Sequence, residues 1–256
     1  MKLTFNASCG SYIGNARTNN EDNFYFNKKH LSIPNKGLKN TLKCDGTTDD
    51  IVMFAVFDGM GGEAMGEEAA CLASEVFSNE LKNFSEIAVS GKEFFLKTCD
   101  KANNAVNKLR ISKQLNSIGT TVVALWFWQN EVVGCNVGDS RIYRIRSKKM
   151  LQISEDHTDA KIMSAIGIDK KPVLLQYLGV PETEMAIEPY ISKGDIQKGD
   201  IYILCSDGIT DVLGMDEIYD TVSSMNADEA VIQLIAKVKI KDGADNSTII
   251  VVRFDD

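Results

Sequence analysis

The fold class is decided by residues 119–146, which read Gly119-Thr-Thr-Val-Val-Ala-Leu-Trp-Phe-Trp128-Gln-Asn-Glu131-Val-Val-Gly-Cys-Asn-Val137-Gly-Asp-Ser-Arg141-Ile-Tyr-Arg-Ile-Arg146. β-branched and aromatic residues dominate this stretch, as they do in strands. The polar breaks at 129–130 and 138–140 are too short for the crossover connections that parallel strands need. We therefore predict an antiparallel meander of three strands, at 119–128, 131–137 and 141–146.

Apolar runs on either side of this stretch predict further buried strands, each bordered by an aspartate. Asp58 follows the first run, Asp207 follows the second, and Asp245 precedes the third. Helical periodicity appears in three other segments. The predicted strands are 51–57, 201–205 and 248–254, and the predicted helices are 63–81, 92–109 and 227–239. Two polar segments without periodicity are predicted as a long loop, 27–50, and as a mixed surface excursion, 154–198.

The composition bounds the class of protein. A chain of 256 residues that is 44% hydrophobic and 25% charged fits one soluble domain over residues 1–256. Its formal net charge of -8 argues against a nucleic acid or a membrane as the partner. The longest apolar run, Val122–Trp128, is far shorter than the ~20 residues of a bilayer span. The N-terminus turns polar at Asn6, before a signal-peptide core develops, so we expect a cytoplasmic protein.

The supply of metal-ligating side chains restricts the kind of site. The six cysteines include no Cys-x-x-Cys pair, and the chain has only two histidines, His30 and His157. A zinc or redox site built on thiols or on several imidazoles is therefore excluded. Any metal in this protein must be held by oxygen.

Four aspartates stand where predicted strands end or begin: Asp58, Asp139, Asp207 and Asp245. Each alone is explained as a turn former or a helix cap. If they converge, their charges repel unless cations neutralise them, and oxygen ligands of this kind favour Mg²⁺ or Mn²⁺. Asp58 could then bridge two ions. Arg17, shortly before Glu21, offers the guanidinium fork that suits a phosphate dianion, and a surface ion pair is the other explanation for it.

Seven short motifs occur in order along the chain: Arg17-Thr-Asn-Asn-Glu-Asp22, Phe57-Asp-Gly-Met-Gly-Gly62, Gly119-Thr-Thr121, Gly138-Asp-Ser-Arg141, Glu155-Asp-His-Thr158, Ser206-Asp-Gly208 and Asp245-Asn246. Together they resemble the metal-dependent protein phosphatase 2C (PPM) family in its compact bacterial form, over nearly the whole chain. The resemblance implies an α+β fold, a four-layer α-β-β-α sandwich of two antiparallel sheets flanked by helices. Segment 154–198 would include a short flap, and segment 27–50 is longer than in compact relatives.

The resemblance also implies a metal centre of two ions, Mg²⁺ or Mn²⁺, and possible room for a third. Asp58, Asp207 and Asp245 would bind the first ion, and Asp58 with the Gly59 carbonyl would bind the second. Asp139 and Asp207 would form the weaker third site.

The remaining motif residues would support the centre or the substrate. Glu21 and Asp22 would act through bound waters, and Asn246 would orient a ligand or a water. Arg17 would hold the phosphate. Met60 stands where eukaryotic relatives often carry histidine, so a metal-bound water, or alternatively His157, would protonate the leaving oxygen.

The implied activity is hydrolysis of phosphoserine and phosphothreonine in proteins by a hydroxide that bridges the two ions, in opposition to a serine/threonine kinase. Cys135-x5-Arg141 also fits a cysteine phosphatase, but a strand follows it where that mechanism needs a helix. Gly59-x-Gly-x-x-Ala64 fits a dinucleotide loop, but neighbouring acids would repel a pyrophosphate. A catalytically silent, phosphatase-like binding or sensor module stays open as the alternative, although such proteins usually lose a metal ligand.

Overall fold

The computed structural model describes residues 2–61, 65–84, 90–168, 170–181 and 183–255. One group of strands comprises β1 (Thr4–Tyr12), β3 (Leu42–Thr47), β8 (Arg141–Arg146), β9 (Lys149–Gln152), β11 (Ile201–Cys205) and β12 (Ser247–Phe254). A second group comprises β2 (Asp22–Phe26), β4 (Val52–Met60), β5 (Gly119–Thr120), β6 (Val122–Trp128), β7 (Glu131–Val137) and β10 (Tyr190–Asp195). The helices are α1 (Gly66–Lys82), α2 (Gly91–Ser112), α3 (Ala160–Ala165), α4 (Asp207–Thr210), α5 (Met215–Ser224) and α6 (Ala227–Ile240).

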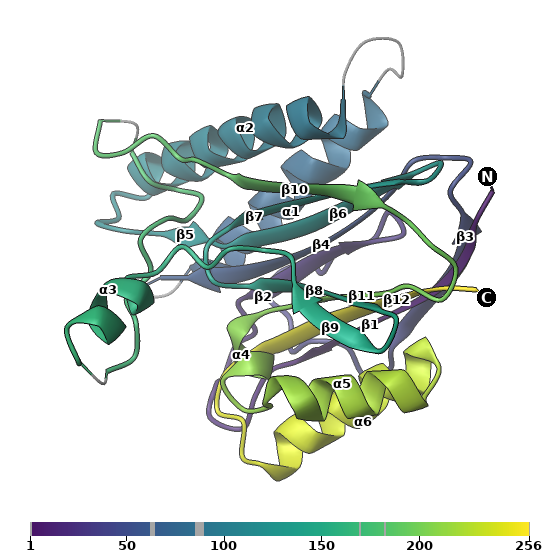
Figure 1. Cartoon of the computed structure of the whole chain (residues 1–256). Helices are drawn as coiled ribbons and strands as arrows, with labels where there is room; N and C mark the ends of the chain where they lie inside the picture. Colours follow the sequence, from purple (N-terminus) through teal and green to yellow (C-terminus); the bar gives the residue numbers. More distant parts are fainter. Residues whose placement is uncertain (1, 62–64, 85–89, 169, 182, 256) are drawn as a thin grey trace.

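The two groups of strands form two stacked sheets, and helices cover both outer faces (Figure 1). The first sheet has the strand order β3-β1-β12-β11-β8-β9. The second has the order β10-β7-β6-β4-β2, with β5 paired to the end of β4. Every strand pair in the described ranges is antiparallel. The predicted fold class is therefore confirmed.

Strand β4 shows how the sequence builds these layers. Phe54 and Val56 pack in the core between the two sheets, whereas Met53, Ala55 and Phe57 pack in the cluster between the second sheet and the helices. Because side chains alternate across a strand, a run without polar residues is buried on both faces. Burial on both faces fixes the strand firmly, so the residues at its C-terminal end are held at a defined place.

The first sheet is covered by α5 and α6. Val222 of α5 and Leu234 of α6 are fully buried in one cluster with Ile203 and Val251 of the sheet. Asn226 begins α6 with a capping box, in which its side chain accepts a hydrogen bond from the Glu229 N–H at 2.9 Å. The predicted helix at 227–239 is thus confirmed.

The predicted meander at 119–146 is only partly right. The strands β6 and β7 form the expected hairpin in the second sheet, but β8 pairs with β11 and β9 in the first sheet. Residues 138–140 therefore cross between the sheets, and the prediction that they make a hairpin was wrong. Gly138 allows this crossing: its φ is +111°, and a Cβ atom there would lie 2.7 Å from the Thr121 side chain.

The two segments without periodicity contain short elements. The expected loop at 27–50 includes β3, and the excursion at 154–198 includes α3 and β10. The predicted helix at 63–81 corresponds to α1, and residues 62–64 lie outside the described residues. No helix within the described ranges is long and apolar enough to cross a bilayer.

Candidate metal centre

An open cleft of about 380 Å³ lies where the two sheets deliver their acidic residues. It is lined by seven of the residues that the sequence singled out: Arg17, Glu21, Asp58, Gly59, Asp139, Asp207 and Asp245. The sequence therefore identified most of the polar lining. Asp22, Asn246 and His157 are not among the residues that line it.

The topology explains why acids that are far apart in sequence meet here. Asp58 lies near the C-terminal end of β4, and its register partner on β2 is Asp22. Asp207 begins α4 directly beyond β11, and Asp245 precedes β12, which is the strand beside β11. Asp139 lies on the crossing between the sheets. The site is thus built where strand ends from both sheets come together.

Gly59 lets the backbone pack tightly behind Asp58. A Cβ atom at this position would lie 2.2 Å from the Gly66 carbonyl oxygen and 2.5 Å from that of Glu21, so a side chain does not fit. The Asp58 carbonyl accepts hydrogen bonds from the Thr121 N–H at 2.8 Å and the Thr120 hydroxyl at 3.0 Å. These contacts hold the Asp58 backbone rigidly at the cleft.

The carboxylates of the cleft oppose one another electrostatically. Burial, and next the charges of Asp22, Asp207 and Asp139, raise the pKa of Asp58 well above its ordinary value. Burial, and next the charge of Asp207, raise the pKa of Asp139 to about 6. Burial, and next the charge of Glu67, raise the pKa of Glu21. Each shift has the same cause, because burial beside other carboxylates disfavours the charged form.

Asp22 lies behind the cleft and is 1% exposed. Burial raises its pKa to about 7, while the nearby hydroxyls of Thr248 and Ser206 favour the charged form. The Ser206 hydroxyl donates to Asp22 Oδ2 at 2.8 Å, and Oδ1 is buried without a hydrogen-bond partner in the described structure. A buried, unpartnered carboxylate oxygen beside Asp58 indicates a place for a cation or an ordered water.

Two cations of the protein itself contact the acids. The guanidinium of Arg17 makes a bidentate pair with Asp245, with both N–O distances at 2.9 Å. The ammonium of Lys171 lies 3.3 Å from Asp207 Oδ2 and 2.8 Å from Asp211 Oδ2. Within the described residues, no three side chains form a ready-made metal-binding group. Arg17 and Lys171 thus offset the negative charges of Asp245 and Asp207.

Sequence reasoning missed Lys171. This residue lies in segment 154–198, where nothing in the local pattern distinguishes it from a solvated surface lysine. Pro172 and Leu174 from the same segment also line the cleft. Only the tertiary fold brings this part of the chain over Asp207.

Asn246 and His157 hold backbone segments. The Asn246 side chain accepts from the Glu21 N–H at 2.8 Å and donates to the carbonyls of Ile13 at 2.6 Å and Asn19 at 3.0 Å. His157 Nδ1 accepts from the Gly138 N–H at 3.3 Å, and burial lowers its pKa. Asn246 therefore fixes the loop that carries Glu21, and His157 fixes the crossing that carries Asp139.

The thiol of Cys135 is unsuited to catalysis. It is 1% exposed, its Sγ lies 3.6 Å from that of Cys99, and burial raises its pKa well above the ordinary value. A nucleophilic cysteine needs a lowered pKa and access to substrate. The Arg141 guanidinium is engaged by Asp156 at 2.7 Å. The cysteine-phosphatase alternative is therefore rejected.

Comparison with known proteins gives a consistent result. A family model described as protein phosphatase 2C matches residues 40–238. The chain is 30% identical over 210 residues to a serine/threonine phosphatase of Listeria innocua, covering 77% of this chain and 82% of the relative. It is similar in structure to the phosphatase PstP/Ppp of Mycobacterium tuberculosis, with a TM-score of 0.80, 24% identity and coverage of 99% and 100% of the two chains. A structure of the PstP catalytic domain with 2 manganese ions has a TM-score of 0.74 and 26% identity, covering 99% of this chain and 100% of that one.

Proposed function

Because this chain belongs to the protein phosphatase 2C family and is a protein serine/threonine phosphatase, we propose that it removes phosphate from phosphoserine and phosphothreonine by a two-metal mechanism. Mn²⁺ or Mg²⁺ would bind between Asp58, Asp207 and Asp245, with the Gly59 carbonyl completing the second position. When bound, the ions would make a water nucleophilic at neutral pH and neutralise charge on the phosphoryl oxygens. A cytoplasmic location and an opposing serine/threonine kinase are part of the same proposal.

The donor set of this protein suits such ions. The donors are carboxylates and one backbone carbonyl, which are the ligands of hard divalent cations that keep bound waters. Burial and neighbouring acids raise the pKa values of Asp58 and Asp139, and the unpartnered oxygen belongs to Asp22, the register partner of Asp58. A bound cation would offset this crowding of acids. Asp139 and Asp207 could hold a third ion, which would have to displace the Lys171 ammonium from Asp207.

Arg17 and Asp245 exchange partners in this proposal. While they are paired, neither the guanidinium fork nor the carboxylate is available. Binding of a cation by Asp245 would release Arg17, which could then hold two oxygens of the phosphate and orient it for in-line attack. The single observation that carries the proposal is the convergence of Asp58, Asp207 and Asp245 from three separate strand ends on one cleft.

The test is turnover of a phosphothreonine peptide by the intact protein with Mn²⁺ and then with EDTA. We expect Asp58→Asn to lower kcat by at least about 1000-fold, because it would remove the carboxylate charge that is proposed to hold the ions. Asp100→Asn is the matched control, since Asp100 is exposed on α2 and does not line the cleft, and it should stay close to wild type. Turnover in EDTA would contradict the metal mechanism, and no turnover with any divalent ion would favour the silent binding module.

A further inference from the structure

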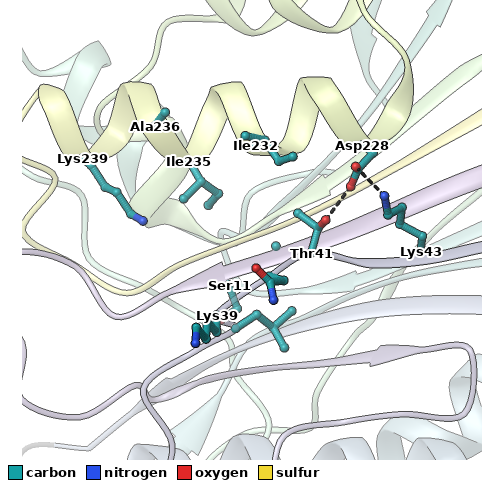
Figure 2. Close-up of a pocket in the computed structure, with 12 residues that line it drawn as sticks. Ser11, Lys39, Thr41, Lys43, Asp228, Ile232, Ile235, Ala236 and Lys239 are labelled. Atoms are coloured by element: carbon teal, nitrogen blue, oxygen red, sulfur yellow. Dashed lines mark hydrogen bonds and ion pairs between the residues drawn. The ribbon is translucent and has the colours of Figure 1, made fainter.

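A second hollow, of about 550 Å³, lies on the outer face of the first sheet, and it shares no lining residue with the catalytic cleft. One wall is a stripe along α6, and the other is the segment that leads into β3 (Figure 2). Gly10 and Ser11 of β1 form its floor. We call it the α6–β3 groove, defined by Ile232, Ile235, Ala236 and Lys239 on one side and Leu38 and Lys39 on the other.

The groove exists because α6 stops one strand short of the edge of the sheet. The helix packs on β1 and β12, whereas β3 is the edge strand beyond β1. Gly10 brings the helix close, since a Cβ atom there would lie 2.6 Å from Val231 Cγ1. The outer face of β3 and the flank of α6 are therefore left facing each other.

The middle of the groove is apolar. Ile232 is 52% exposed, and Ile235, Ala236 and Leu38 are only partly buried. Their spacing on α6 puts Ile232, Ile235 and Ala236 on one helical face, which is the pattern of a packing surface. The described residues leave this face uncovered, so its aliphatic side chains are available for a ligand.

The charges of the groove are unequal at its two ends. Both carboxylate oxygens of Asp228 already have partners. Ser8 and Thr41 donate hydrogen bonds to one oxygen, and the Lys43 ammonium lies 2.9 Å from the other. Lys39 and Lys239 lie on the side away from Asp228 (Figure 2), and neither has an ion pair within the described ranges. Lys239 instead lies 4.5 Å from the centre of the Tyr12 ring. Two uncompensated cations thus mark one end, on a protein whose net charge is -8.

We propose that the α6–β3 groove binds an acidic and aliphatic segment of the phosphoprotein substrate, at a distance from the phosphorylated residue. Aliphatic side chains would cover Ile232 and Ile235, and carboxylates would pair with Lys39 and Lys239. The helical stripe from Ile232 to Lys239 is about 10 Å long, a length that an extended peptide of about three to four residues would match. Two lysines are too few for a nucleic-acid backbone, and an acidic protein is repelled by an anionic membrane.

The position of the groove relative to the cleft favours a substrate over an unrelated partner. Asn35, three residues before Leu38 of the groove, accepts hydrogen bonds from the Asn20 N–H at 3.3 Å and from the Asn20 side chain at 3.1 Å, and Asn20 precedes Glu21 of the cleft. A segment bound here would be tethered close to the catalytic residues. Tethering raises the local concentration of the phosphorylated residue, so it should lower KM and leave kcat unchanged. This inference rests on the proposed phosphatase activity.

The first test measures binding alone. A fluorescein-labelled, unphosphorylated peptide of about eight alternating Leu and Asp residues is titrated with the intact protein, and fluorescence polarisation reports binding. We expect saturable binding that weakens at least about tenfold when Lys39→Glu and Lys239→Glu are combined. Ile232→Ser should weaken it about threefold. The matched controls are Ile240→Ser, at an 83% exposed position of α6 outside the groove, and Lys97→Glu on α2.

The second test measures turnover. A phosphothreonine peptide is compared with the same peptide joined by a flexible linker to the Leu-Asp segment, and we expect a lower KM for the joined peptide only in the wild type and the controls. Failure of the wild type to hydrolyse either peptide would refute the phosphatase activity and leave the binding result intact. Absent binding, equal binding by the double variant, or a preference for a Leu-Lys peptide or for lipid vesicles would overturn the groove proposal.

Discussion

At the scale of single residues, the bidentate pair between Arg17 and Asp245 joins the two functions of the cleft. One member is the proposed phosphate ligand, and the other is a proposed metal ligand. The side chains are 51% and 39% exposed, so the pair itself contributes little to stability. Its importance lies in the competition between the guanidinium and a metal ion for the same carboxylate.

Because of this competition, we expect removal of the Arg17 side chain to strengthen metal binding and to weaken catalysis. Arg17→Ala should tighten Mn²⁺ binding about two- to fivefold, because the exposed ion pair that it removes is worth only up to ~1 kcal/mol. The same change should lower kcat/KM for a phosphothreonine peptide about 100-fold, because the phosphate loses its guanidinium. Calorimetric titration with MnCl₂ and steady-state kinetics measure the two effects. Weaker metal binding by this variant would show that Arg17 does not compete for Asp245.

At the scale of the elements, the crossing at residues 138–140 carries Asp139 from one sheet to the other. Gly138 has a φ of +111° and lies against Thr121. His157 holds the same turn through its ring and through its backbone N–H, which donates to the Gly138 carbonyl at 3.0 Å. The geometry of the crossing therefore determines where the Asp139 carboxylate lies.

Gly138→Ala should strain this crossing. We expect it to lower the free energy of unfolding by about 1–3 kcal/mol, because alanine is disfavoured at positive φ and its Cβ atom meets Thr121. Gly214→Ala is the matched control, since Gly214 has a φ of -67° and nothing lies within 4 Å of its Cβ position. Urea unfolding followed by circular dichroism compares the two variants. Equal stability would mean that the crossing tolerates a side chain.

The sequence predicts the elements whose own residues form a clear apolar pattern. It misses features that depend on contacts with residues far away in the chain. The strand at 201–205 was predicted residue for residue, because its apolar run is bounded by polar turns. Strand β2 was missed: Asp22–Phe26 is a mixed polar and aromatic segment that is buried only because it pairs with β4. The motif acids could be expected in the cleft because the family resemblance implied it, whereas no motif indicated the contact of Lys171 with Asp207.

At the scale of the whole molecule, the acids of the cleft couple stability to pH. The pKa of Asp22 is about 7 in the folded chain, against an ordinary value of 3.8, and that of Asp139 is about 6. The folded chain therefore holds these protons more tightly than the unfolded chain does. The resulting stabilisation of the folded state is fully present when the pH is below the ordinary pKa of 3.8, and it is lost as the pH rises through about 6 to 7.

A divalent ion should replace the lost protons. We expect saturating Mn²⁺ to raise the melting temperature of EDTA-treated protein by about 5–10 °C near pH 7.5, and by clearly less near pH 5, where protons compete with the metal. Differential scanning calorimetry at the two pH values measures this difference. The same measurement is made with Ca²⁺ in place of Mn²⁺. A shift that is the same at both pH values would show that the metal binds outside the acid cluster.

The place of β12 in the first sheet has a consequence for biosynthesis. Among the described elements this strand comes last in sequence, yet it lies between β1 and β11, and Asp245 stands two residues before its start. Until residues 245–254 have left the ribosome, the sheet is divided into two halves and one of its acids is missing. A partly synthesised chain that lacks residues 245–254 therefore has neither a continuous first sheet nor Asp245 in the cleft.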